Sequence, residues 1–173
     1  MVLSKSVKGS VPVMATDKHM KFNLNGIDFF VRLIDEKYPD FRSVIPKDFM
    51  GSVLLDTVKL SDLVKDAKPF VFGDSKQGNF DIGSKGIALH VNNPEKDFQW
   101  DAKLPVSEQS GDEIKIGLNV HYLEKILKGI TEKELTWEYS SPVSASILKG
   151  QNEESQITHL IMPVRIKETS HGE

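Results

Sequence analysis

The fold is decided by a segment that changes its hydrophobic period midway, Ile114-Lys115-Ile116-Gly117-Leu118-Asn119-Val120-His121-Tyr122-Leu123. Over residues 114–118 every second side chain is apolar or aliphatic, as in a half-buried β-strand. Asn119 is a suitable cap for a helix over residues 120–129, which carries apolar residues at helical spacing and ends at Gly129. The segment therefore predicts a strand that runs directly into an α-helix.

The same order of strand and helix occurs earlier in the chain. Residues 52–56 (Ser-Val-Leu-Leu-Asp) predict a short strand, and residues 57–68 predict a helix that Pro69 ends. Three strand-like runs follow each helix, at about 78–83, 86–92 and 97–104 after the first and at 134–140, 143–149 and 158–166 after the second. The repeated βαβββ pattern predicts an α+β fold in which two helices pack on antiparallel sheets.

A β-hairpin is predicted ahead of the first repeat. Residues 19–24 and 27–33 both alternate apolar and polar side chains, and they flank the pair Asn25-Gly26. An Asn-Gly pair between two alternating runs is a strong signal for a tight hairpin turn.

Composition narrows the class of protein. The chain has 173 residues, a net charge of −3 and no cysteine, which excludes disulfides and cysteine-ligated metal sites. Neither a signal peptide nor a membrane-spanning apolar run is evident, so we expect a soluble, cytoplasmic protein with no membrane partner. The acidic total argues against tight non-specific wrapping of nucleic acid, although a local basic surface can still attract DNA.

The motifs of common active sites are missing from the sequence. The five histidines lack the spacing of metal ligands, and Gly73 and Gly78 have the spacing of a phosphate-binding loop but are followed by Asn79-Phe80 instead of Lys-Ser/Thr. We therefore expect no enzymatic activity, no catalytic residue, no bound metal and no cofactor.

Lysines are frequent on the two predicted helices. They are Lys59, Lys65 and Lys68 on the first and Lys125 and Lys128 on the second. Two interpretations remain open: an ordinary solvated helix face, or a shallow cationic surface that faces DNA and contacts phosphates without sequence preference.

Five segments carry a further pattern. They are residues 33–46, 91–95, 116–123, 141–144 and 160–166, the last of which reads Leu-Ile-Met-Pro-Val-Arg-Ile. Together and in this order they resemble the C-terminal part of the bacterial DNA polymerase III sliding clamp, the beta subunit. The resemblance implies the DNA-clamp fold, which is itself built from βαβββ units.

The resemblance also implies a domain division. Residues 1–46 would be the terminal strands of the second clamp domain with its connector, residues 47–166 the third domain, and residues 167–173 a polar tail. Sliding clamps are rings of subunits joined head to tail around duplex DNA, with helices lining the hole. The lysines above would then face DNA, and Phe70 and Val71 would lie at the ring interface, exposed in a lone subunit.

A peptide-binding pocket is implied as well. Its residues would be Pro39, Val44, Leu160, Met162, Pro163, Val164 and Arg165, with Ser43 and Ala145 at matching positions that carry less typical side chains. Flexible Met and aliphatic side chains suit an adaptable apolar pocket. Arg165 could hold a peptide through hydrogen bonds to its carbonyl or carboxylate groups. Without the resemblance, residues 160–166 would be interpreted as a core strand.

The resemblance implies a function as a processivity factor, which tethers other proteins to DNA. Partners would be polymerases and repair proteins with clamp-binding motifs, the clamp loader, other clamp subunits and, if a ring forms, duplex DNA. The matching segments do not include the first clamp domain or most of the second. The alternative is therefore a short decoy or regulator that binds clamp-binding motifs, or a full clamp, without encircling DNA.

Overall fold

The structure of the chain is a computed structural model that describes residues 10–24, 26–38, 40–93, 97–152 and 157–166. The chain divides into two compact units, Met1–Asp40 and Phe41–Glu173. The division lies a few residues before the predicted boundary at residue 47. The predicted polar tail, 167–173, lies outside the described residues.

The first unit is a three-stranded antiparallel sheet. Its strands, in the order β1-β2-β3, are β1 (Val13–Ala15), β2 (His19–Leu24) and β3 (Ile27–Arg32). The predicted hairpin is confirmed, because β2 and β3 pair through Leu24 and Ile27 across the turn. Gly26 has a φ of 86°, a backbone conformation that glycine adopts without strain.

The second unit contains both βαβββ repeats. Its elements in chain order are η2 (Phe41–Ser43), β4 (Gly51–Asp56), α1 (Thr57–Ala67), η3 (Lys68–Phe70), β5 (Gln77–Gly83), β6 (Gly86–Asn93), β7 (Phe98–Leu104), β8 (Glu108–Gly111), β9 (Ile114–Asn119), α2 (Val120–Leu127), β10 (Glu134–Tyr139), β11 (Ser146–Gly150) and β12 (His159–Ile161). None of the helices in the described part of the chain is long and apolar enough to cross a membrane.

The two repeats exchange their first strands. One sheet has the order β12-β11-β10-β4-β8, and the other has the order β7-β6-β5-β9. Thus β4, which begins the first repeat, pairs with β10 of the second, while β9, which begins the second, pairs with β5 of the first. Neither sheet is complete without a strand from the other repeat, so the two halves form one cooperative domain.

In both repeats the last residue of the first strand caps the helix that follows. The Asp56 side chain accepts a hydrogen bond from the Lys59 backbone N–H at 3.0 Å, and Asn119 accepts one from the Tyr122 backbone N–H at 3.0 Å. The backbone hydrogen bond from Lys59 is the main reason that the pKa of Asp56 is lowered. This confirms the predicted cap at Asn119 and adds its counterpart at Asp56.

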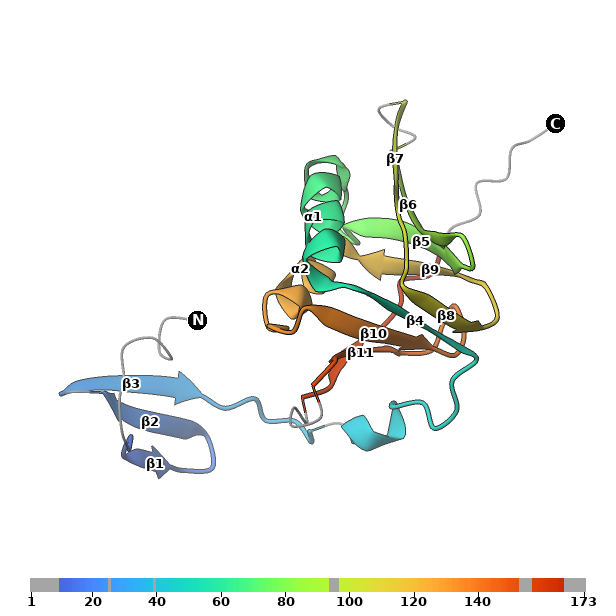
Figure 1. Cartoon of the computed structure of the whole chain (residues 1–173). Coiled ribbons are helices and arrows are strands. Elements are labelled where there is room, and N and C mark those ends of the chain that lie inside the picture. The colour runs from blue at the N-terminus through green and yellow to red at the C-terminus, as the bar shows by residue number, and fades with distance from the viewer. Residues whose placement is uncertain (1–9, 25, 39, 94–96, 153–156, 167–173) are drawn as a thin grey trace. The chain divides into compact units, whose positions relative to one another are not determined.

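Helices α1 and α2 lie side by side, and their buried faces pack against the core that the two sheets share (Figure 1). The sheets are also joined by an aromatic contact, since Phe80 of β5 meets Trp137 of β10 edge to face at 5.4 Å between ring centroids. Both side chains are fully buried. The βαβββ prediction and the α+β class are confirmed.

Two predicted strands are shorter than expected, and two strands, β1 and β8, were missed. β11 begins at Ser146 instead of residue 143, and β12 ends at Ile161 instead of residue 166. Pro163 has no backbone N–H to continue the pairing, which accounts for the early end of β12. Of the missed strands, β1 has only three residues and β8 is short and polar, so neither sequence carries much periodic signal.

The C-terminal segment crosses from one sheet to the other. Ile161 is the last residue of β12, in the five-stranded sheet. Three residues later the Val164 N–H donates a hydrogen bond, at 2.8 Å, to the carbonyl of Gly117, which lies on β9, the edge strand of the four-stranded sheet. A Cβ at Gly117 would lie 2.5 Å from the Val164 carbonyl oxygen, so only glycine permits this approach.

The two helices are joined by a buried carboxylate. The Glu124 carboxylate on α2 forms two ion pairs, one with Lys128 at the end of the same helix and one with Lys68 at the end of α1, each at 2.8 Å. The Glu124 side chain is only 11% exposed. Hydrogen bonds from Lys128 and then Lys68 lower the pKa of Glu124 from 4.5 to about 2. The carboxylate therefore stays charged throughout the neutral and mildly acidic range.

We expect Glu124→Gln to lower the free energy of unfolding by about 1–3 kcal/mol at pH 7, because both ammonium groups lose their charged partner. Because the folded-state pKa is lowered, the contribution is complete above pH 4.5 and is lost as the pH falls toward 2. Denaturant unfolding of both proteins across this range measures the difference. The control is Asp62→Asn, which removes an exposed pair with Lys65 and should change the stability by less than about 0.5 kcal/mol. Equal losses in the two variants would contradict the bridging role.

We expect Gly117→Ala to release the C-terminal segment without unfolding the domain, because the added methyl group meets the Val164 carbonyl. Hydrogen exchange of the Val164 amide, which donates to Gly117 in the native protein, should become at least tenfold faster. Amides of the β5–β6 pairing serve as an internal control and should keep their protection. Unchanged exchange at Val164 would show that the crossing does not depend on this glycine.

Candidate functional site

The predicted DNA-facing lysines all lie on or next to the paired helices. Lys59, Lys65, Lys125 and Lys128 are exposed, and Lys68 is half-buried. The apolar sides of both helices face the core, so the exposed lysines project away from the sheets.

Three of the five lysines are paired with carboxylates. Lys68 and Lys128 both bind Glu124, and Lys65 binds Asp62 at 3.0 Å. The Lys65–Asp62 and Lys128–Glu124 pairs have the i,i+3 and i,i+4 spacing of neighbours on a helix, which the sequence displays, whereas the Lys68–Glu124 pair forms only when the helices meet.

The other two lysines keep their charge available. Within the described residues, Lys59 and Lys125 form no ion pair. The Lys125 ammonium lies 5.5 Å from the centre of the exposed Tyr122 ring. The helix surface is therefore less cationic than its five lysines indicate, and its available positive charge comes chiefly from Lys59 and Lys125.

Most of the predicted pocket residues lie in or just after β12. Leu160, Pro163 and Val164 are half-buried, while Arg165 is exposed and Met162 is 51% exposed. The crossing from β12 to Gly117 fixes the backbone of this segment at both ends. It therefore presents apolar side chains from an ordered backbone.

Successive side chains of β12 point alternately into the core and away from it. Ile161 is 4% exposed and belongs to the core, whereas Leu160 lies opposite Ile147 on the other side of the strand. The interpretation as a core strand would bury Leu160, Met162, Val164 and Ile166, and it was wrong for the exposed Met162, because the buried residue of this segment is Ile161.

The remaining pocket predictions have mixed outcomes. Val44 follows η2 and is 47% exposed, and Ala145 is buried just before β11. Ser43 is exposed at the end of η2, and Pro39 lies outside the described residues.

One of the two predicted ring-interface residues is not exposed. Val71 is only 4% exposed and belongs to the core, because the turn η3 directs the chain back against the domain. The expectation that it would be exposed was wrong. Phe72, the next residue, is 40% exposed.

Phe70 is half-buried in a stack of aromatic rings. Its ring lies 5.1 Å from Phe98 and 5.8 Å from Trp100, at interplanar angles of 16° and 20°. Sequence analysis overlooked both β7 partners, although Phe98 and Trp100 alternate on one face of the predicted strand 97–104. The stack forms a rigid aromatic surface beside the edge strand β7.

Groups that could support metal chemistry are not assembled in the described ranges. No cluster of three or more His, Asp or Glu side chains able to hold a metal ion occurs there. His90 lies between Asp101, at 2.5 Å, and Asp81, at 3.8 Å, so both ring nitrogens face carboxylates within a cross-strand network.

Comparisons with known proteins agree on one family. The family model for the "DNA polymerase III beta subunit, C-terminal domain" matches residues 42–165. Among curated relatives, the "Beta sliding clamp" of Treponema pallidum is 29% identical over 166 residues, covering 91% of this chain and 43% of the relative. The protein of the same name from Streptococcus pneumoniae TIGR4 is 24% identical over 158 residues, covering 90% of this chain and 41% of the relative.

Solved structures show the same fold. The beta subunit of DNA polymerase from Streptococcus pyogenes superposes with a TM-score of 0.75 at 28% identity, covering 90% of this chain and 42% of that one. The sliding clamp from Bartonella birtlesii bound to griselimycin gives a TM-score of 0.81 at 22% identity, covering 95% of this chain and 44% of that one.

The matches cover most of this chain but less than half the length of these relatives. The family match spans well over half of the chain and coincides with the unit that holds both βαβββ repeats. The chain therefore belongs to the family of the bacterial DNA polymerase III beta subunit, the sliding clamp, and residues 42–165 match the C-terminal domain of that family.

Proposed function

We propose that the chain is a subunit, or part of a subunit, of a DNA sliding clamp that tethers replication and repair proteins to duplex DNA. The observation that carries the proposal is the match of residues 42–165 to the clamp's C-terminal domain. Its partners would be a DNA polymerase, repair proteins, a clamp loader and other clamp subunits. This role requires binding surfaces and no catalysis, so we propose no enzymatic activity.

Partner proteins would dock through short peptides on the segment 160–165, together with Val44. Support comes from the exposure of Met162 and Val44, since unpaired apolar side chains favour a hydrophobic ligand. Arg165, in the same segment as Met162, is exposed and can donate to a peptide carbonyl or carboxylate. An affinity in the micromolar range is expected for a pocket of this limited extent.

DNA would lie against the paired helices. The exposed lysines provide non-specific attraction to phosphates, weakened where Asp62 and Glu124 already neutralise them. Phe70, with Phe98 and Trp100 beside it, offers an aromatic surface to a neighbouring subunit. Val71 would contribute by supporting this surface from the core.

The proposal predicts that Met162→Glu combined with Pro163→Glu reduces the affinity for a clamp-binding peptide at least tenfold, because charge is placed on the apolar docking surface. Fluorescence anisotropy of a labelled peptide measures the affinity. The matched control is Val58→Glu, which also places an acid at an exposed apolar position, on α1, and should leave the affinity unchanged. Equal binding by the double variant and the native chain would contradict the pocket assignment.

A second prediction concerns the helix lysines. Lys59→Gln combined with Lys125→Gln should weaken binding to a short DNA duplex several-fold at about 50 mM salt. Lys65→Gln combined with Lys128→Gln should weaken it less, because the ammonium groups of Lys65 and Lys128 are already paired with carboxylates. Electrophoretic or anisotropy titrations at several salt concentrations test this ranking. Peptide binding without any DNA binding would favour the alternative, a decoy that only occupies clamp-binding motifs.

A further inference from the structure

The outer face of the four-stranded sheet carries a row of side chains that spans all four strands. Cross-strand pairing places Lys103 of β7 beside Ala88 of β6, Ala88 beside Asp81 of β5, and Asp81 beside Lys115 of β9. Because side chains alternate along a strand, this row lies on the side of the sheet opposite to the one that faces the core and helices.

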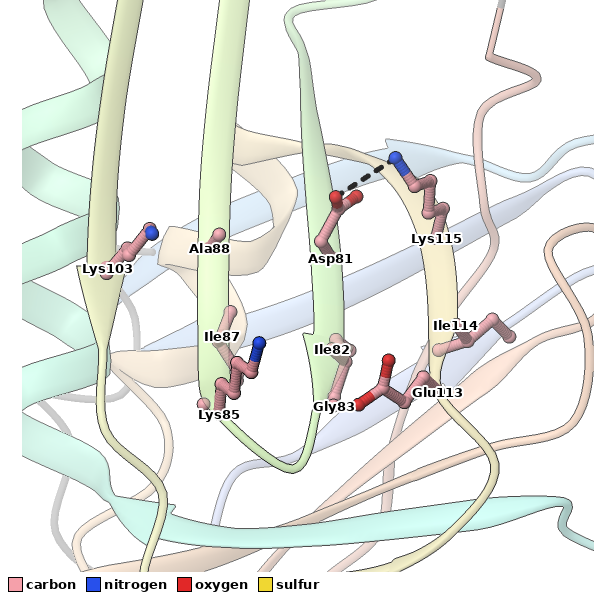
Figure 2. Close-up of a pocket in the computed structure, with 11 residues that line it drawn as sticks. Asp81, Ile82, Gly83, Lys85, Ile87, Ala88, Lys103, Glu113, Ile114 and Lys115 are labelled. Atoms are coloured by element: carbon pink, nitrogen blue, oxygen red, sulfur yellow. Dashed lines mark ion pairs between the residues drawn. The ribbon is translucent and has the colours of Figure 1, made fainter.

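The row forms part of a hollow of about 370 Å³, whose lining is shown in Figure 2. The small side chain of Ala88 leaves space between its longer neighbours Lys103 and Asp81. Lys85 enters from the turn between β5 and β6, and Ile114 contributes an apolar wall. The hollow is thus open, partly apolar at its base and surrounded by charged groups.

The carboxylates of this hollow already have partners. Asp81 binds the Lys115 ammonium at 3.1 Å. Glu113 accepts hydrogen bonds from the Ser84 hydroxyl at 2.9 Å and the Ser84 backbone N–H at 3.2 Å, which lower its pKa.

Two cations of the hollow lack a direct ion pair, although the charge of Lys85 also acts on the nearby Glu113 carboxylate. Lys85 and Lys103 form no ion pair among the residues that the structure describes. These two ammonium groups are therefore available to an anionic ligand, on a chain whose net charge is −3.

A second hollow, of about 350 Å³, continues along the same face and shares Asp81 and Lys115 with the first. Its lining includes three amide side chains, Asn79, Asn92 and Gln99. Asn79 already accepts a hydrogen bond from Gln77 and Gln99 donates one to Asp101, each at 2.7 Å. The Asn92 amide and the remaining donor and acceptor groups of the other two can serve an extended peptide backbone. The two hollows together form one groove with cations at one end and amides at the other.

The charges of this face favour a peptide over nucleic acid. Asp81, Asp101 and Glu113 all lie on or beside the groove, and a continuous phosphate backbone would be repelled by their carboxylates. A peptide can instead place one or two carboxylates at Lys85 and Lys103 and leave neutral backbone next to the acids.

We propose that this groove binds an extended acidic segment of a partner protein, with its carboxylates on Lys85 and Lys103 and its backbone along the amide side chains. The surface is separate from the helix lysines and from the segment 160–165. The chain would therefore hold two protein ligands by different chemistry, one apolar and one acidic.

The test uses as its probe a fluorescein-labelled hexapeptide of two glutamates followed by four neutral residues, and anisotropy at about 25 mM salt as the measurement. We expect saturable binding that weakens as salt is added, and at least a fivefold loss of affinity in Lys85→Gln combined with Lys103→Gln. The matched control is Lys47→Gln combined with Lys133→Gln, which removes the same charge from exposed positions outside the groove and should bind like the native chain. Thermal unfolding checks that both variants remain folded.

Three results would overturn the proposal. One is the absence of saturable binding of this hexapeptide to the native chain. Another is an equal loss in the control variant, which would show a response to net charge alone. The third is loss of binding in Lys59→Gln combined with Lys125→Gln, which would place the ligand on the helix face. Competition by a short DNA duplex that depends on Lys85 and Lys103 would also contradict the choice of an acidic peptide.

Discussion

The exchange of β4 and β9 between the two sheets is the constraint on which the rest of the second unit depends. Each repeat gives its first strand to the sheet of the other, so each helix begins where the chain leaves one sheet and returns toward the other. The helices must then lie next to each other against the shared core. Asp56 and Asn119, the last residues of the exchanged strands, cap the helices at these two equivalent points.

The same arrangement controls the charge of the helix surface. Because α1 and α2 are adjacent, Lys68 at the end of one reaches Glu124 on the other, and a group that sequence analysis counted as available becomes part of a structural pair. The surface that would face DNA is consequently only weakly cationic. Weak attraction suits a protein that is proposed to move along DNA, since each strong phosphate contact would slow that movement.

Sequence periodicity was sufficient for most of the fold and insufficient for most of the site. The hairpin at Asn25-Gly26, both helices and the core strands were predictable because their apolar side chains repeat with the period of their secondary structure. The burial of Val71 was not predictable, because it depends on the direction in which the η3 turn returns the chain. The pairing of Lys68 and the stacking of Phe70 on β7 likewise arise only when segments distant in the sequence come together.

The crossing of residues 162–164 from β12 to Gly117 has a thermodynamic consequence. A segment attached to two different sheets loses its conformational freedom when the domain folds. A ligand that docks on Met162 or its neighbours would therefore meet a surface that is already ordered, and little of its binding free energy would be needed to organise the protein. Gly117, which has no side chain to contact any ligand, would in this way set the affinity of a site built from other residues.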